Sequence, residues 1–504
     1  MTQNFADADA SSAIQDIELV FGLVGPTGVD LTAVCDALES KLSEVSYATE
    51  IVSLSQLIAV FLKTKIRNNN EYERIKDLMT LGTKLREETK QVDIVGRLGI
   101  AQIRSIREKK TQDPLQPVPR VAYIVRSFKR PEEVELFRKV YGKAFTLLSV
   151  YAPRLSRIKR IERQFSTSTQ TRERAEQLAI EIIKRDYSEE QNKEFGQNVS
   201  DTFPLADYFI TSGSATEIDE NIKRLVRLVF GDPYLSPSRD EQSMFFAQSA
   251  ALRSLDLSRQ VGAAIVNSDG DVLCTGCNEV PKSSGGLYWT GDEYCHRDYE
   301  LGHDSNVTIK REMIEEMFCK LRAAKWLSPK MMKKTAIELT EESLTINEKP
   351  LKDAKLLDVI EFGRAVHAEM AAITQAAKNG VALAGSRLFC TTFPCHICAR
   401  HILSSGISDV IFIEPYEKSR TGELYSDSIS IEPSDHVSNK TVFRAFVGVA
   451  PRRYMDLFTL TTKRKNSKGE IISESEIGKQ PKLKRSALTY LALEDMMINT
   501  TKHP

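Results

Sequence analysis

Apolar residues in the first half of the chain follow two patterns, continuous runs and helical spacing. Residues 17–24 form an apolar run that ends in a glycine-rich turn. Residues 31–42 follow with apolar positions at helical spacing, and Asp30 is placed to cap the helix that this spacing predicts. Further apolar runs, each predicting a buried strand, lie at residues 121–125, 145–151 and 208–210. Strands that alternate with helices predict an α/β domain built on a parallel sheet.

The pattern changes after residues 231–238, where glycine, proline and serine mark a break. The elements predicted beyond it are a helix at 239–255, hairpin strands at 261–266 and 272–277, a helix at 366–378, a strand at 387–391, a helix at 395–404 and a strand at 410–414. A long insertion at about 281–363 has no strong strand pattern. This order predicts a three-layer α/β/α domain in which helices cover a mixed sheet.

The length of the chain predicts more than one domain. At 504 residues it exceeds what one hydrophobic core usually serves. We expect domains at residues 1–231 and 236–460, followed by a C-terminal extension at 461–504. Residues 463–485 are polar and basic, which predicts a flexible loop.

The charge balance excludes a general attraction to nucleic acid, because Lys+Arg and Asp+Glu both number 69. One local basic segment remains, which fits a solvated helical face, a nucleotide lid or an RNA-contacting patch. It consists of Arg154, Arg157, Lys159, Arg160 and Arg163. No stretch approaches the roughly 18 apolar residues of a membrane span, and the polar, acidic N-terminus has no apolar leader. We therefore expect a cytoplasmic protein without membrane contact.

The placement of the cysteines indicates chemistry rather than a disulfide scaffold. The chain has 8 cysteines, and all but Cys35 lie in its C-terminal half. They are too sparse for a disulfide-dense fold, so the asymmetry favours a metal or catalytic use. Cys274 and Cys277 form one C-x-x-C pair, but residues three apart on a strand face opposite sides. We interpret these two as packing residues.

One motif combines His367 and Glu369 with Cys395 and Cys398, which follow Pro394. The pattern H-x-E…P-C-x-x-C is that of zinc-dependent deaminases. It supplies three zinc ligands, as catalytic zinc sites do, and leaves Glu369 free to move protons. In this interpretation zinc makes a water molecule nucleophilic, and Glu369 passes protons from that water to a ring nitrogen and to departing ammonia.

Other interpretations of these residues remain open. Cys395 and Cys398 alone fit a thioredoxin-like redox pair, and a structural zinc site is a further alternative, but neither requires Glu369. A second, structural zinc is an additional hypothesis for the insertion, where the alternative is ordinary loop residues. Its candidate ligands are Cys295, His296 and His303.

Residues 258–267 and 391–395 resemble the first hairpin strand and the approach to the metal in the deoxycytidylate deaminase branch of the cytidine deaminase fold. The resemblance covers about residues 239–431, with the enlarged insertion as the main departure. It implies that Asn278 hydrogen-bonds the pyrimidine or sugar of a nucleotide and that Lys378 contacts its phosphate.

These two assignments have structural alternatives. Asn278 also fits a turn-capping asparagine, and Lys378 a solvated lysine at a helix end. Tyr416 and Lys418, just past the last predicted strand, are weaker candidates for the same pocket.

The whole chain resembles the bacterial antiphage dCTP/dCMP deaminases, in which a P-loop-kinase-like domain precedes the deaminase domain. Residues 21–30, 132–138 and 151–157 carry this resemblance. It implies conversion of deoxycytidine nucleotides to deoxyuridine nucleotides, which starves phage replication. It also implies a homo-oligomer and, for some members, an inhibitory small RNA as partner.

The glycine-rich turn of the first domain departs from a working P-loop. Residues 29–31 read Val-Asp-Leu where Gly-Lys-Ser/Thr is expected, so phosphoryl transfer is not expected. Backbone amides at Gly25, Thr27 and Gly28 can still bind a phosphate, and we interpret the turn as a regulatory or vestigial nucleotide pocket. The alternative is a tight strand-to-helix turn.

Three functions follow from these observations. The leading hypothesis is a zinc-dependent deaminase of free deoxycytidine nucleotides that is regulated through its first domain. The second is a cytosine deaminase of single-stranded DNA or RNA, against which the neutral charge and the bulky insertion argue. The third is a catalytically silent protein that senses nucleotides or RNA.

Overall fold

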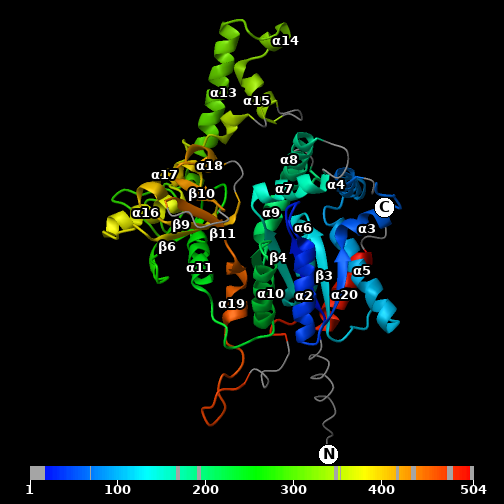
Figure 1. Cartoon of the computed structure of the whole chain (residues 1–504). Coiled ribbons are helices and arrows are strands. Elements are labelled where there is room, and N and C mark those ends of the chain that lie inside the picture. Colours follow the sequence, from blue (N-terminus) through cyan, green and yellow to red (C-terminus); the bar gives the residue numbers. More distant parts are fainter. Residues whose placement is uncertain are drawn as a thin grey trace, which may run out of the picture. The chain divides into compact units, whose positions relative to one another are not determined.

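The computed structural model describes residues 17–67, 70–165, 171–189, 194–345, 350–351, 354–415, 419–432, 439–473 and 481–499. The chain forms two compact units, shown together in Figure 1 and described here one at a time. The first unit comprises Met1–Gln242 with Ala445–Pro504, and the second comprises Ser243–Arg444.

A six-stranded sheet forms the centre of the first unit within the described residues. Its strands are β1 (Leu19–Val24), β2 (Ala48–Ser53), β3 (Val121–Phe128), β4 (Phe145–Tyr151), β5 (Tyr208–Thr211) and β12 (Gly448–Val449). They lie in the order β12-β5-β4-β1-β3-β2. β1 pairs in parallel with β3 and β4, whereas the short β12 is antiparallel to β5. The predicted α/β arrangement with a mainly parallel sheet is confirmed.

Helices cover both faces of this sheet. They are α2 (Leu31–Glu44), α3 (Leu54–Phe61), α4 (Glu71–Thr89), α5 (Ile94–Thr111), α6 (Pro131–Tyr141), α7 (Arg154–Phe165), α8 (Arg172–Ser188), α9 (Val199–Thr202), α10 (Ala215–Val229), α19 (Tyr454–Phe458) and α20 (Ala487–Asn499), with short 3-10 turns η1 (Gly142–Ala144), η3 (Phe203–Leu205) and η5 (Pro451–Arg453). Leu19, Phe21 and Leu23 of β1 belong to the core beneath α2 and α10, while Val20 and Val24 belong to the core beneath α3, α5 and α6. The strand is apolar along its whole length because both of its faces are buried.

The C-terminal part of the chain returns to the first unit. The sequence placed residues up to 460 in the second domain, but the structure assigns the chain from Ala445 onward to the first unit. β12 extends the sheet beside β5, and α20 packs against α5. In the buried contact between these helices, Arg107 lies 2.8 Å from carboxylate oxygens of both Glu18 and Glu494. A long-range ion network of this kind leaves no periodic signal in the sequence.

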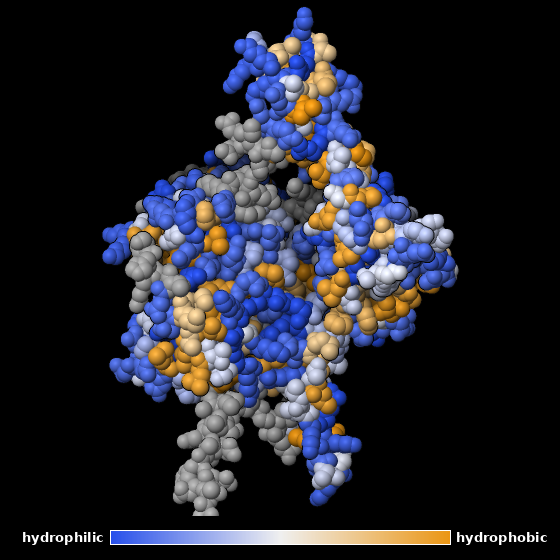
Figure 2. Space-filling model, turned by 180° about the vertical axis from the view of Figure 1, so that it is seen from behind, coloured by the Kyte–Doolittle hydropathy of each residue, from blue (hydrophilic) through white to orange (hydrophobic). Residues whose placement is uncertain are grey.

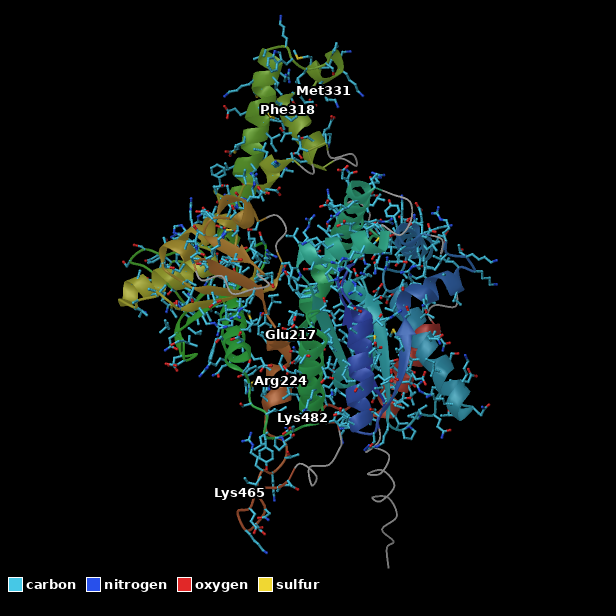
Figure 3. All side chains as sticks on the ribbon, viewed as in Figure 1. Glu217, Arg224, Phe318, Met331, Lys465 and Lys482 are labelled. Atoms are coloured by element: carbon cyan, nitrogen blue, oxygen red, sulfur yellow. The ribbon has the colours of Figure 1, made fainter. Side chains whose placement is uncertain are left out.

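The segment predicted as a flexible loop at 463–485 is partly ordered. Lys465, labelled in Figure 3, forms an antiparallel bridge with Ile471. The Tyr234 hydroxyl lies within hydrogen-bond distance of the carbonyl oxygens of Arg464 (2.9 Å) and Ile472 (2.8 Å), which share its one hydrogen, and it links the two arms. Residues 464–472 of this basic segment therefore form a short hairpin, because an aromatic side chain from another region holds it.

The second unit is built on a mixed six-stranded sheet, counted over the described residues. Its strands are β6 (Gly262–Val266), β7 (Val272–Cys277), β8 (Arg387–Thr392), β9 (Asp409–Glu414), β10 (Ile429–Ile431) and β11 (Thr441–Ala445). They lie in the order β10-β11-β9-β8-β6-β7. β6 and β7 form the predicted hairpin, and β8 and β9 are parallel.

The helices against this sheet include α11 (Arg239–Ala251), α16 (Ala368–Asn379), α17 (His396–Ser404) and α18 (Thr421–Leu424). A Cβ atom at Gly276 of β7 would overlap the carbonyl oxygen of Ala368 and the backbone nitrogen of Ala372. Only glycine lets α16 lie this close to the strand. This close packing fixes the distance between the start of α16 and the sheet.

The insertion between β7 and α16 is helical. It contains α12 (Asp298–Leu301), α13 (Ser305–Ala323), α14 (Pro329–Met332), α15 (Ala336–Thr345) and the 3-10 turn η4 (Lys355–Asp358). α13, α14 and α15 project from the rest of the second unit, with Phe318 and Met331 on the projection (Figures 1 and 3). Trp326, 80% exposed, follows α13.

Hydrophilic side chains dominate the surface seen in Figure 2, with smaller hydrophobic patches between them. Among the helices of the described residues, none combines the length and the apolar character that a membrane span requires.

Candidate functional site

Two helix starts in the second unit bring the predicted metal ligands together. His367 is the N-cap residue of α16, Cys395 is the N-cap residue of α17, and Cys398 lies in the first turn of α17. His367 Nδ1 lies 3.3 Å from Cys395 Sγ and 3.4 Å from Cys398 Sγ. All three ligand atoms lie within 4.8 Å of one another.

Backbone contacts outside the helices set both starts. Before α16, Val366 exchanges two backbone hydrogen bonds with Glu279, of 3.0 and 3.2 Å, at the end of the hairpin. Before α17, the carbonyl oxygen of Pro394 accepts hydrogen bonds from the hydroxyls of Ser419 (3.0 Å) and Thr421 (3.2 Å). These contacts explain how residues from two separate segments meet at one point.

The three side chains fit a tetrahedral zinc ion. Zinc bonds of about 2.3 Å to sulfur and about 2.0 Å to nitrogen place such ligand atoms roughly 3.5 Å apart. The distances of 3.3 and 3.4 Å agree with this spacing. No other His, Cys, Asp or Glu joins the group within the described residues. Three protein ligands are the number that catalytic zinc sites use, whereas structural sites usually have four.

Electrostatics in the group favour exchange of protons for a cation. The hydrogen bond from Cys398, followed by that from His367, lowers the pKa of Cys395 despite its burial. The hydrogen bond to Cys395 in turn raises the pKa of His367, and Cys395 also raises the pKa of Cys398. The three groups therefore share protons among themselves. A divalent cation replaces those protons, because metal binding requires deprotonated ligands.

Glu369 lies beside this group in the first turn of α16, with only 4% of its surface exposed. Burial, reinforced by the charge of Cys395, raises the pKa of its carboxyl group. A carboxyl group in such surroundings can take up and release a proton closer to neutral pH than an exposed one.

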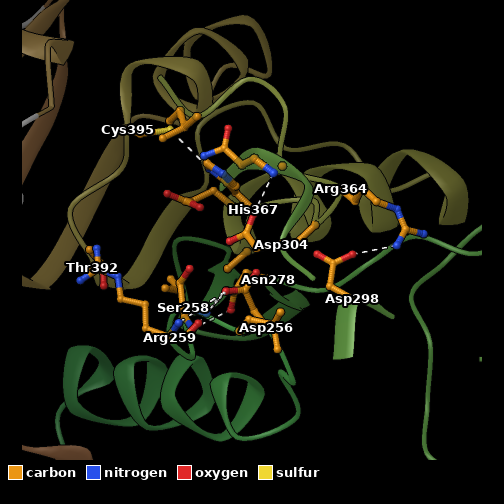
Figure 4. Close-up of a pocket in the computed structure, with 18 of the residues that line it drawn as sticks. Asp256, Ser258, Arg259, Asn278, Asp298, Asp304, Arg364, His367, Thr392 and Cys395 are labelled. Atoms are coloured by element: carbon orange, nitrogen blue, oxygen red, sulfur yellow. Dashed lines mark hydrogen bonds and ion pairs between the residues drawn. The ribbon is translucent and has the colours of Figure 1, made fainter. Parts of the chain in front are cut away.

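A cavity of about 320 Å³ opens onto these residues (Figure 4). One wall comes from the segment before β6 and from Thr392 and Phe393 at the end of β8. The opposite wall comes from the insertion and the residues after it: Asp298, Asp304, Asn306, Ile360, Gly363, Arg364 and Ala365. The volume is in the range of small-molecule sites.

Asn278 lines this cavity, as its predicted role requires, but much of its amide is engaged. Its Oδ1 accepts a hydrogen bond from the backbone of Val261 (2.7 Å), and its Nδ2 donates to the carbonyl oxygen of Arg259 (2.8 Å). The side chain therefore braces the loop before β6. One amide hydrogen and one lone pair are left for another contact.

The structure does not bring Lys378 to the cavity. This residue lies at the far end of α16 beside Gly285 and Gly286, outside the cavity lining. At about 1.5 Å per residue, it lies roughly 13 Å along the helix axis from Glu369. The cavity lining gives no support to Lys378 as a phosphate contact, which stays a prediction.

Sequence reasoning missed two cations that do line the cavity, Arg259 and Arg364. Arg259 Nη1 lies 2.6 Å from Glu414, and Arg364 Nη1 lies 2.7 Å from Asp298 (Figure 4). Arg259 stands in the motif before β6, so a signal existed for it. Arg364 precedes His367 by three residues and carries no pattern that marks it.

The candidates for a second metal do not converge. Cys295 Sγ lies 3.7 Å from the Tyr299 hydroxyl, and His303 Nδ1 lies 3.2 Å from the carbonyl oxygen of Leu301. Together with His296 they form no three-ligand group among the residues that the structure describes. In this structure the loop points these side chains to different neighbours, and the second zinc stays a prediction. Tyr416 and Lys418 lie outside the described residues.

The glycine-rich turn lies in the first unit, where Gly25, Thr27 and Gly28 line a separate cavity. The basic segment of α7 lies at the same place but is not simply solvated. Arg157 is buried and donates to the carbonyl oxygen of Ala152 (3.2 Å), and Arg160 pairs with Asp30 (2.8 Å).

Comparison with known proteins identifies the type of domain. Residues 237–414 match the family model for the cytidine and deoxycytidylate deaminase zinc-binding region, and residues 358–471 match that of MafB19-like deaminases. The chain thus carries a deaminase domain of the cytidine and deoxycytidylate type.

Individual relatives match short parts of the chain. The deoxycytidylate deaminase of Enterobacteria phage T2 is 40% identical over 57 residues, which are 11% of this chain and 30% of the relative. The probable deoxycytidylate deaminase of Drosophila melanogaster is 35% identical over 95 residues, 18% of this chain and 42% of the relative. The chain thus spans less than half the length of these relatives. A crystal structure of dCMP deaminase from the cyanophage S-TIM5, in complex with dCMP and dUMP, also matches. The match covers 42% of this chain and 99% of the phage chain, with 18% sequence identity and a TM-score of 0.23.

Proposed function

We propose that the protein is a zinc-dependent hydrolytic deaminase of free deoxycytidine nucleotides, dCTP, dCMP or both. The observation that carries the proposal is the convergence of His367, Cys395 and Cys398 beside the buried carboxyl group of Glu369, at the wall of one cavity. The reaction replaces the C4 amino group of cytosine with oxygen from water and releases ammonia.

His367, Cys395 and Cys398 would hold the zinc ion. When bound, zinc supplies a Lewis acid that makes water nucleophilic near neutral pH. Glu369 accepts a proton from the attacking water and donates it to the N3 ring nitrogen, then transfers the second proton to the departing amine. Its raised pKa suits both directions of this transfer.

The cavity supports a free nucleotide as substrate rather than a polynucleotide. The insertion contributes an entire wall, including Asp298, Asp304 and Asn306. A single strand that continued past the reacting base would need an open channel there. We assign the remaining amide contacts of Asn278 to the base or sugar. Phosphate neutralisation goes to Arg259 and Arg364 in place of Lys378, because a nucleotide needs cations within reach.

The experiment is to incubate the full-length, zinc-loaded protein with dCTP and with dCMP and to measure ammonia together with the uracil nucleotide. Glu369→Ala should abolish product formation while retaining zinc. Glu312→Ala, on an exposed position of α13, is the matched control. Activity that survives Glu369→Ala would remove this carboxylate from the mechanism. Deamination of a cytosine-containing oligonucleotide that free dCTP does not suppress would identify a polynucleotide substrate instead.

The resemblance to antiphage deaminases supports a role in depleting the deoxycytidine nucleotide pool during infection. Cells that carry the protein should then resist phage, and cells that carry Glu369→Ala should not. Equal resistance in the two would separate the biological role from the chemistry.

A further inference from the structure

The turn that follows β1 lies where a parallel sheet ordinarily receives a ligand. β1 is flanked by β3 and β4, and the chain leaves β1 and β4 toward opposite edges of the sheet. Ligands bind outside the carboxyl ends of the strands at such a point. A cavity of about 320 Å³ is present there, lined by the turn, by the end of β3 and by residues of α4 and α7.

A carboxylate from elsewhere in the chain, that of Asp186, already binds the anion-binding groups of this turn. The backbone N–H of Thr27 donates to Asp186 Oδ2 at 2.6 Å, across 159 residues of sequence. Lys129 Nζ donates to both carboxylate oxygens of Asp186, at 2.7 and 3.0 Å, and to the carbonyl oxygen of Gly25 at 3.1 Å. The Asp186 side chain has no exposed surface.

These contacts reproduce the chemistry of phosphate recognition. A phosphate-binding turn offers a backbone amide and a lysine ammonium to anionic oxygens. Here the amide comes from Thr27, and the ammonium comes from the segment after β3, since the turn itself has Val29 and Asp30 at the expected lysine region. Both groups donate hydrogen bonds to the carboxylate of Asp186.

The rest of the cavity carries polar groups that call for a ligand. Gln197 is 5% exposed and Arg86 is 1% exposed, and both line the cavity. Gln197 Oε1 and Arg86 Nε have no hydrogen-bond partner in the described part of the chain. A buried acceptor and a buried donor without partners are unfavourable unless a polar molecule meets them.

We propose that Asp186 is an internal substitute for a phosphoryl group, and that a phosphate-bearing small molecule enters this cavity only by displacing Asp186 from Thr27 and Lys129. Such a ligand, a nucleotide or a similar phosphorylated metabolite, presents an acceptor to Arg86 and a donor to Gln197. The site is separate from the metal centre, and the inference does not rest on the deaminase proposal.

The test compares binding of inorganic pyrophosphate to the full-length wild-type protein, Asp186→Ala and Asp186→Asn, by calorimetry and thermal denaturation. Both variants remove the negative charge that holds Lys129, and alanine also frees the amide of Thr27, so both should bind pyrophosphate at least roughly tenfold more tightly than the wild type. The loss of Asp186 should also lower the melting temperature, and pyrophosphate should restore part of it. Asp113→Ala, on an exposed loop of the same unit, is the control.

Lys129→Met combined with Asp186→Ala should cancel the gain, because the ammonium is the cation of the site. Asp186→Asn preserves the shape of the side chain and gives the answer if the alanine variant does not fold. Equal affinity of the wild type and Asp186→Asn, or a gain that persists without Lys129, would overturn the proposal. A nucleoside triphosphate tested on Asp186→Asn should bind more tightly than pyrophosphate, since it carries additional polar groups that can meet Gln197 and Arg86 in the same cavity. Equal binding would also contradict the proposal.

Discussion

The turn after β1 and the turn after β8 are both strand-to-helix turns, but the polar groups of the two turns have different partners. Each leaves the carboxyl end of a parallel strand, and each is followed by a helix whose N-terminus favours negative charge. After β8, the thiols of Cys395 and Cys398 are oriented with His367 around a point beside a cavity. After β1, the amide of Thr27 is taken by Asp186. A strand-turn-helix element thus acquires chemistry only when its polar groups are not satisfied by the chain itself.

Buried charge pairs of the first unit differ from the buried Glu369 in the same way. In the first unit they are paired with each other, as in Arg107 with Glu18 and Glu494, or Arg86 with Glu133 at 3.0 Å. In the second unit, Glu369 is buried against ligand side chains and faces a cavity. Paired charges hold elements together, whereas a buried carboxyl group at the wall of a cavity can exchange protons with a bound molecule.

The strongest test of this contrast removes a metal ligand. Cys395→Ser should lose both zinc and all measurable deaminase activity, because two ligands do not hold the ion in a three-ligand site. Metal analysis and an ammonia assay on the same preparation check this. Cys319→Ser, at an exposed cysteine, should keep both. Full activity without zinc would refute the catalytic role of the group.

The next largest effect is expected for Glu369→Gln, which keeps the size of the side chain but not its ability to move protons. The turnover number should fall about 10²- to 10⁴-fold, the usual contribution of a general acid–base group. Zinc content should remain at the wild-type value. A fall in zinc binding that parallels the loss of activity would assign Glu369 a structural role.

A change in the first unit should affect stability instead of chemistry. Glu494→Ala leaves the Arg107 guanidinium buried with one partner fewer, and breaking such a pair costs about 3–5 kcal/mol of unfolding free energy. Denaturant titration measures this loss. The turnover number of the protein that remains folded should be unchanged, and a selective loss of turnover would show that the two kinds of site are not independent.

The smallest effect is expected for Arg364→Ala. This change removes a cation from the cavity and should raise the KM for the nucleotide about tenfold, or roughly 1.4 kcal/mol, with a smaller change in kcat. Steady-state kinetics with dCMP and with deoxycytidine separates a phosphate contact from any other role of Arg364. Deoxycytidine has no phosphate, so its KM should not change. An equal change in KM for both compounds would show that Arg364 does not act through the phosphate.

Local sequence patterns predicted the elements well where the signal is short in range. The helix capped by Asp30, the hairpin of β6 and β7, and the starts of α16 and α17 all appear close to their predicted residues. Lys378 shows the limit of such reasoning, because helical spacing places it on α16 but does not decide whether it reaches the cavity.

The sequence by itself determined the α/β alternation, the ligand set of His367, Cys395 and Cys398, and the type of chemistry that these residues suggest. Spacing of two or three residues at a helix start defines side-chain directions through local backbone geometry. Only the tertiary structure decided that the insertion walls the cavity, that α20 returns to the first unit, and that Asp186 reaches Thr27. These contacts join segments far apart in the chain, and they depend on packing and charge pairing, which have no period along the sequence.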